Sequence, residues 1–418
     1  MKVAGFIANR IAFNRSTAKG DNKRSFSGFI IRLATIATAV SVMVMVVTLA
    51  FANGFQQTVS QKIFSFWGHI RIQEKQPDKS IISEETPIIQ DPALANAIRQ
   101  NPEVKSIHSF ATKYAILKTT DEIEGVLVKG FDSTFSTEHF QSFILDGRFI
   151  QFNDSTYSRE IMLSEFTAKR LQLKTGDRIL IYFIRPDESI RPDKLTVSGI
   201  YKTGIEEYDK TFAIGDIKLI QRLNEWMPDE IGGYEVFLND YKKIDPVADE
   251  IYNMHDFPLV WDAVSVKRIS PNIFDWLNMQ DKTRNLLIIF MLVVAVINLI
   301  SCLLILVLER VRMIGILKSI GATNWTVQKI FLYHSFLITV RGVLLGLILG
   351  LGLLFLQKAT GFIRLQEEAY YVSTAAVKIV WWQVLVVCLV TLIISFLVML
   401  IPSLLARKIQ PVKAVQFR

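Results

Sequence analysis

The sequence predicts an α-helical membrane protein with four transmembrane helices and a large mixed α/β extracytoplasmic domain between helices 1 and 2. The chain of 418 residues is 50% hydrophobic and only 21% charged, which is more apolar than most soluble proteins of this length. Four apolar stretches are long enough to cross a bilayer as helices, since the hydrocarbon core needs about 20 residues. Most of the polar remainder lies in one block between the first two stretches.

The four predicted spans are residues 29–52, 286–308, 331–356 and 382–400. The first ends on Ala50-Phe51-Ala52, an A-x-A sequence that can mark signal-peptide cleavage. Its apolar run is longer than that of a signal peptide, so we expect the span to be retained. Asn298 lies in the second span, and His334 and Arg341 lie in the third. A charge inside a bilayer usually pairs or faces protein, so we expect Arg341 to pair with Glu309 or a partner subunit.

The orientation follows from the basic residues that flank the spans. Lys and Arg dominate residues 1–28, 309–330 and 401–418, whereas residues 357–381 also carry Glu367 and Glu368. Short basic flanks stay in the cytoplasm, so we expect a cytoplasmic N-terminal segment, loop and tail in a multi-pass inner-membrane protein. The domain at 53–285 and the loop at 357–381 then face the periplasm. The net charge of +8 therefore points to a membrane and not to nucleic acid.

The domain at 53–285 mixes short strands and helices. Alternating or β-branched runs predict strands at 69–73, 115–119, 125–128, 179–184 and 194–200. Helical patterns cover 92–99, 164–172 and 217–225. Residues 56–66 and 272–284 continue spans 1 and 2 as helices, which predicts a stalk that moves the domain when these spans move.

Catalytic and nucleotide-binding motifs are missing from the sequence. It contains no G-x-S-x-G, H-E-x-x-H or G-x-x-x-x-G-K-[ST], and its two cysteines, Cys302 and Cys388, lie in apolar stretches. We therefore assign no catalytic, cofactor-binding or metal-binding residue and expect that the chain is not an enzyme.

The cytoplasmic loop at 309–330 contains one amphipathic helix. Met313, Ile316, Leu317 and Ile320 follow the i, i+3, i+4, i+7 spacing of a single apolar face. Gly321 is placed to end the helix, and Thr323 or Asn324 to cap the next one. The pattern fits both a helix on the membrane surface and a helix that docks into a groove of a cytoplasmic partner.

Several motifs make the chain resemble the FtsX-like ABC-transporter permeases, and among them the lipoprotein-releasing (Lol-type) permeases. Gly315-Ile316-Leu317-Lys318 with Ile320-Gly321-Ala322 is similar to the coupling-helix signature of that family. Asn53-Gly54-Phe55 is similar to the family's N-G-F after span 1, and Tyr370-Tyr371-Val372 to an element before span 4. Further similarities are Val294–Ser301 in span 2, Gly176-Asp177 and Val197–Tyr201 in the domain, and Pro402 to Val415 in the tail.

This resemblance implies the permease subunit of a type VII, or mechanotransmission, ABC transporter with a MacB-like periplasmic domain. The implied partners are a dimer of cytoplasmic ABC ATPases, which binds ATP and Mg, a second permease copy or paralogue, a lipoprotein substrate and a periplasmic lipoprotein carrier. The residues implied in ATPase coupling are Arg312, Met313, Gly315, Ile316, Leu317, Lys318, Ile320 and Gly321. Those implied in substrate contact are Val40, Met43, Val47, Asn53 and Phe55.

The sequence departs from the carrier-binding members in one loop. Those members carry a longer connection where this chain has only residues 185–193, which argues against carrier docking by this chain. Two other functions stay open on the sequence: a MacB/FtsX-like permease that exports peptides or amphiphiles or regulates a cell-wall hydrolase, and a membrane-anchored sensor or enzyme without an ATPase.

Overall fold

A computed structural model describes residues 26–75, 84–153, 156–184, 190–309 and 311–408. The chain divides into two compact units. The helical unit holds residues Met1–Gln56, Leu277–Arg364 and Thr374–Arg418, and the α/β unit holds Gln57–Trp276 and Leu365–Ser373. Most of the predicted N-terminal segment (1–28) and tail (401–418), with the tail's Pro411 and Val415, lies outside the described residues.

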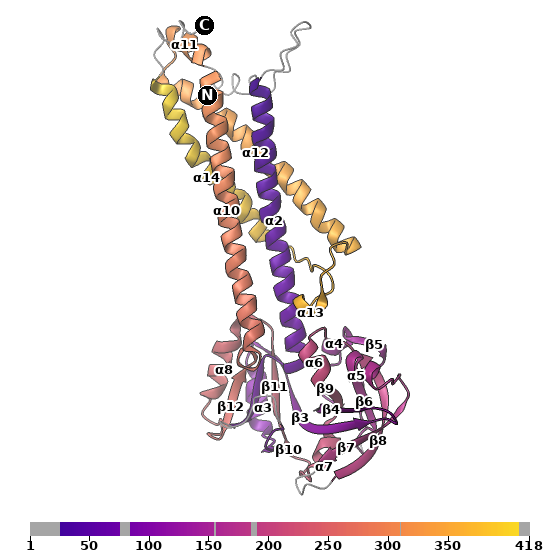
Figure 1. Cartoon of the computed structure of the whole chain (residues 1–418). Helices are drawn as coiled ribbons and strands as arrows, with labels where there is room; N and C mark the ends of the chain where they lie inside the picture. Colours follow the sequence, from indigo (N-terminus) through magenta and orange to yellow (C-terminus); the bar gives the residue numbers. More distant parts are fainter. Residues whose placement is uncertain (1–25, 76–83, 154–155, 185–189, 310, 409–418) are drawn as a thin grey trace. The chain divides into compact units, whose positions relative to one another are not determined.

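The predicted spans lie in four long helices. These are α2 (Phe26–Trp67), α10 (Pro271–Glu309), α12 (Asn324–Thr360) and α14 (Trp381–Lys408), and each is long and apolar enough to cross a membrane. Helices α2 and α10 run well beyond the apolar stretches that identified them (Figure 1). This confirms the helical extensions predicted at 56–66 and 272–284.

Glycines let helices α2 and α12 approach closely within the helical unit. A Cβ atom at Gly342 would lie 2.7 Å from the Cβ of Thr38, and one at Gly346 would lie 2.9 Å from the Cβ of Val42. Such close backbone contact is typical of helix pairs in membranes. Around it, the apolar core gathers residues of α2, α12 and α14, namely Val42, Met45, Val46, Leu49, Ala50, Val343, Leu354, Val384 and Val387.

Ten strands of the α/β unit form one sheet within the described ranges. Nine follow the order β12-β1-β11-β3-β4-β9-β6-β8-β5, and β7 pairs with both β3 and β8. The ring β3-β4-β9-β6-β8-β7 is therefore closed. The strands are β1 (Ile70–Glu74), β3 (Val104–Lys118), β4 (Ile123–Phe131), β5 (Ile144–Gly147), β6 (Glu160–Ser164), β7 (Arg178–Ile184), β8 (Ile190–Tyr201), β9 (Phe212–Asp216), β11 (Gly233–Leu238) and β12 (Trp261–Ser265). Strands β2 (Ile88–Ile89) and β10 (Glu230–Ile231) pair separately.

Short helices connect these strands, several of them with the caps that the sequence indicates. Asp91, Ser164 and Asp216 each accept a backbone hydrogen bond at a helix N-terminus. The predicted helices correspond to α3, α5 and α7. The helices are α3 (Pro92–Gln100), α4 (Glu138–Gln141), α5 (Glu165–Arg170), α6 (Glu206–Thr211), α7 (Ile217–Leu223), η1 (Tyr241–Lys243), α8 (Ile244–Tyr252), α9 (Val266–Ile269) and α13 (Glu367–Tyr370).

The predicted loop at 185–193 was too long. Strand β8 already begins at Ile190, which pairs with Ile184, so only residues 185–189 join β7 to β8, and these lie outside the described residues. Pro192 lies within β8, where it pairs with Tyr182 of β7. Proline is tolerated in a strand where its missing N–H faces no neighbouring strand. Because β8 pairs with β6 only from Thr196 onward, Pro192 has no partner on the β6 side of β8.

The C-terminal end of α2 is held by a buried charge cluster in the α/β unit, which we define as Arg71, Glu85, Lys129 and Glu235. All four side chains are at most 3% exposed. Lys129 donates from Nζ to the carbonyl oxygen of Phe66, near the end of α2, and to Oε1 of Glu235 at 2.6 Å. Burial lowers the pKa of Lys129 to about 8, although Glu235 opposes the shift. A cation is favoured at a helix C-terminus.

Candidate functional site

The candidate site is the segment that joins α10 to α12. Helix α11 (Val311–Ser319) lies in this segment. Gly321 follows it with φ of +95°, a left-handed conformation that glycine adopts at no steric cost. The Thr323 hydroxyl accepts a hydrogen bond from the N–H of Thr326 at 3.3 Å, which caps α12. The predicted helix stop at Gly321 is confirmed, and Thr323 is the cap.

The side chain of this helix that the protein buries lies outside the predicted apolar face of Met313, Ile316, Leu317 and Ile320. Ile314 is fully buried and packs with Val307, Val327 and Phe331, and Met313 lies against this cluster. Ile316 is 46% exposed and Ile320 is 78% exposed. Gly315 is buried, Leu317 and Lys318 are half-buried, and Arg312 and Gly321 are exposed. Ile316 and Ile320 are therefore the exposed members of the predicted face.

Trp325 is an exposed aromatic residue that is not among the predicted ATPase-coupling residues. It lies in the first turn of α12 and is 48% exposed. The Nζ atom of Lys329 lies 5.2 Å from the centre of its ring, within the range of a cation–π contact. Aromatic side chains are enriched at protein–protein interfaces. The position of Trp325 two residues after Thr323, at the start of α12, was the available signal.

The five residues implied in substrate contact do not share one environment. Val40 is 45% exposed on α2, and Ile36, one turn earlier, and Leu33, about two turns earlier, are also exposed. Met43, Val47 and Phe55 are half-buried, and Val47 packs against the core of the helical unit. Asn53 donates from Nδ2 to Oε1 of Gln383 in α14 at 2.5 Å. Only Val40 in this set lies on the open side of α2.

The polar residues within the spans also face protein. The Nδ2 atom of Asn298 donates to the carbonyl oxygen of Ala34 at 3.4 Å, which links α10 to α2. His334 is 1% exposed, and Arg341 is half-buried. The predicted partner of Arg341, the side chain of Glu309, lies outside what the structure describes.

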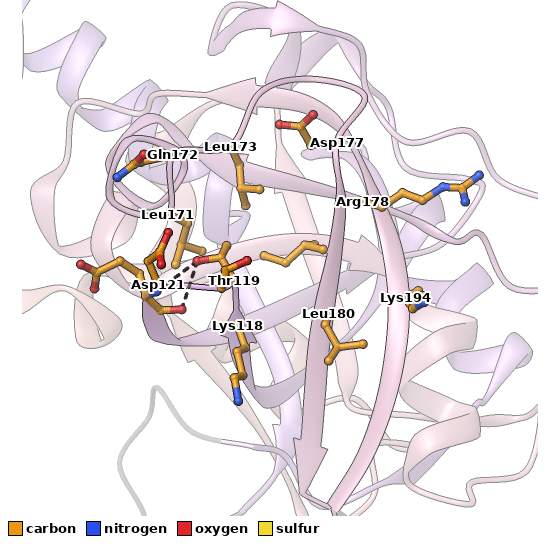
Figure 2. Close-up of a pocket in the computed structure, with 13 residues that line it drawn as sticks. Lys118, Thr119, Asp121, Leu171, Gln172, Leu173, Asp177, Arg178, Leu180 and Lys194 are labelled. Atoms are coloured by element: carbon orange, nitrogen blue, oxygen red, sulfur yellow. Dashed lines mark hydrogen bonds between the residues drawn. The ribbon is translucent and has the colours of Figure 1, made fainter.

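The α/β unit offers an open groove but no catalytic arrangement. The groove lies beside the β3–β4 turn, the end of α5 and strands β7 and β8. Figure 2 shows that Lys118, Asp177 and Arg178 extend in different directions, while Thr119 bonds the backbone of Glu122 and closes the turn. Among the described residues, no group of three or more His, Cys, Asp or Glu side chains is arranged to hold a metal ion.

Two family models match the chain. The MacB-like periplasmic core domain matches residues 33–253, which is more than half of the chain. The FtsX-like permease C-terminal model matches residues 285–411, a range that contains α11 and the whole candidate site.

Curated relatives align over almost the full length. The lipoprotein-releasing system transmembrane protein LolE of Haemophilus influenzae is 24% identical, with 94% of this chain and 95% of the relative covered. LolC of the same organism is 25% identical, with 94% of each chain covered. A solved periplasmic region of MacB from Actinobacillus actinomycetemcomitans is 12% identical over 49% of this chain and 91% of that one, with a TM-score of 0.34. At that score the structural likeness bears on neither fold nor function.

Proposed function

The chain belongs to the family of the MacB-like periplasmic core domain, and on that premise we propose that it is the permease subunit of a type VII ABC transporter that releases lipoproteins from the inner membrane. The observation that carries the proposal is the exposed apolar pair of Ile316 on α11 and Ile320 directly after it, inside the FtsX-like match. The names of the aligned relatives, which describe lipoprotein-releasing systems, supply the cargo.

The partner at α11 is a separate cytoplasmic ATPase that binds ATP and Mg. Exposed isoleucines one helical turn apart fit a helix-in-groove contact, in which the anchors lie on one side of a short helix. Buried Ile314 joins α11 to α12 through Val327 and Phe331, so a push on α11 reaches the membrane helices through packed side chains. Since the sequence carries no P-loop of its own, the chain is the driven subunit and not the enzyme.

The arrangement in the membrane follows from this assignment. The α/β unit is periplasmic and lies between spans 1 and 2, both termini are cytoplasmic, and α2 and α10 carry motion into the α/β unit as continuous helices. A second permease copy or paralogue completes the complex. The connection between β7 and β8 is residues 185–189, shorter than the nine residues expected, which argues against carrier docking by this chain.

A substitution on α11 tests the ATPase contact. Ile316→Asp places a charge in the apolar contact without touching buried Ile314, so the ATPase should no longer co-purify with the full chain. Leu259→Asp is the matched control, because Leu259 is 90% exposed in the α/β unit and receives the same charge. Co-purification of the ATPase with Ile316→Asp at the wild-type level would contradict the proposed contact.

A further inference from the structure

The α13 loop, which we define as Leu365–Ser373, is more than a connection between two membrane helices. In sequence it lies between α12 and α14, yet in the structure it belongs to the compact α/β unit. Its one-turn helix α13 ends at Tyr371, which has φ of 58°. A left-handed backbone is unfavourable for a bulky residue and persists only where surrounding contacts hold it.

Two stalk helices supply contacts to Tyr371. Lys62 of α2 donates from Nζ to the carbonyl oxygen of Tyr371 at 2.7 Å. Trp276 of α10 meets the Tyr371 ring edge to face, with ring centres 5.5 Å apart and an interplanar angle of 80°. A single residue of the loop therefore contacts both helices that lead into the α/β unit.

Glu367 adds a charged attachment to the same loop. Its Oε2 atom lies 2.7 Å from Nζ of Lys202, directly after β8, and its Oε1 atom lies 3.8 Å from Nζ of Lys62. Gly204, with φ of +74°, leaves the space that these side chains fill, because a Cβ atom there would overlap both Glu367 and Lys62. The hydrogen bond that Lys202 donates to Glu367 raises the pKa of Lys202.

Hydrogen bonds also hold the ends of the loop and the residues that flank it. Leu365 donates from its backbone N–H to the carbonyl oxygen of Ser373 at 2.9 Å, which closes the loop. In the helical unit, the Gln357 side chain is 2% exposed. It donates to the carbonyl oxygens of Ile363 (3.3 Å) and Ala375 (3.1 Å) and accepts from the N–H of Ile363 at 2.9 Å. A loop closed and bonded in this way can transmit a displacement.

We propose that the α13 loop is a third attachment between the membrane helices and the α/β unit, and that Glu367 is the positioning residue that holds it on Lys62 and Lys202. Spans 3 and 4 then act on the α/β unit directly, alongside the stalk formed by α2 and α10. The consequence for transport rests on the function proposed above, whereas the attachment itself does not.

The test uses the full chain with its ATPase in lipid nanodiscs. Glu367→Lys places a third cation beside Lys62 and Lys202. Adding Lys202→Glu restores an opposite-charge pair, although Lys62 still faces the new lysine. Glu206→Lys is the matched control, because it reverses a Glu–Lys pair (Glu206 with Lys210) of the same unit, outside the loop. Backbone hydrogen exchange of residues 365–373 reports attachment, and lipoprotein released per ATP hydrolysed reports coupling.

We expect Glu367→Lys to speed exchange of the loop amides about ten-fold and to lower release per ATP about five-fold, with hydrolysis within two-fold of wild type. The Glu367→Lys/Lys202→Glu pair should recover most of both losses, which a merely structural defect would not allow, and Glu206→Lys should change neither. Unchanged loop exchange in Glu367→Lys would overturn the attachment, and faster exchange with unchanged release per ATP would overturn its role in coupling. If the wild-type complex releases no lipoprotein, the proposed function fails, and loop exchange alone decides the attachment.

Discussion

The buried charge cluster yields a stability prediction whose size follows from the structure. Lys129 and Glu235 are 0% and 1% exposed. Removing one member of such a pair leaves an uncompensated charge, which costs about 3–5 kcal/mol. In a domain of 150–250 residues, about 1 kcal/mol shifts Tm by roughly 2–4 °C, so Lys129→Met should lower the Tm of the α/β unit by roughly 6–20 °C.

Thermal unfolding of the full chain in detergent, followed by tryptophan fluorescence, measures this effect. Buried Trp67 lies 4.9 Å from Nζ of Lys129 and serves as a local probe. Lys129→Met/Glu235→Leu removes both charges. It leaves the carbonyl oxygen of Phe66 without the hydrogen bond from Lys129, and an unsatisfied buried acceptor costs about 1–3 kcal/mol. The double variant should therefore be more stable than the single one. Arg148→Met is the control, because the exposed pair with Glu160 contributes about 1 kcal/mol or less. A double variant no more stable than Lys129→Met would refute the reasoning.

Three further predictions follow from the packing and the charges. The first concerns pH. The pKa of Lys129 is about 8 in the folded protein and its ordinary value is 10.5, so above pH 8 the unfolded chain binds more protons than the folded one. The contribution of Lys129 to the free energy of unfolding therefore rises with pH, by up to about 1.4 kcal/mol per pH unit. The Tm difference between wild type and Lys129→Met/Glu235→Leu should accordingly grow in favour of wild type from pH 7.5 to 9. The second concerns Gly346→Val, which should separate α2 from α12 and lower the yield of folded protein in gel filtration, whereas Gly352→Val, where a Cβ meets nothing within 4 Å, should not. The third concerns Asp209, which accepts from the N–H of Thr203, the N–H of Gly204 and the hydroxyl of Thr203 at 2.8–3.0 Å; Asp209→Ala should cost about 1–3 kcal/mol, and a melting curve within 2 °C of wild type would contradict this.

Sequence periodicity was sufficient for the parts of the fold that have one buried face or a long apolar run. It placed the four spans, the helical extensions of α2 and α10, and α11. It missed β9 and β11, because every residue of these strands is buried and a strand covered on both sides shows no alternation.

Within the candidate site, periodicity predicted an apolar face of Met313, Ile316, Leu317 and Ile320 but not the burial of Ile314. The burial of Ile314 depends on Val307 and Phe331, which belong to α10 and α12. The partner of Asn53 is 330 residues away in the sequence, and the contacts of the α13 loop with Lys62 and Lys202 are equally non-local. Such pairings depend on tertiary structure, which local sequence patterns do not encode.

The most direct test of the central claim is to deplete the chain in cells and follow newly made outer-membrane lipoproteins by pulse labelling and membrane fractionation. If the chain is the permease of a lipoprotein-releasing transporter, these lipoproteins should accumulate in the inner membrane as the chain disappears. Expression of wild-type protein should reverse the accumulation, and Ile316→Asp should not. Normal delivery of lipoproteins to the outer membrane in cells that lack the chain would contradict the account.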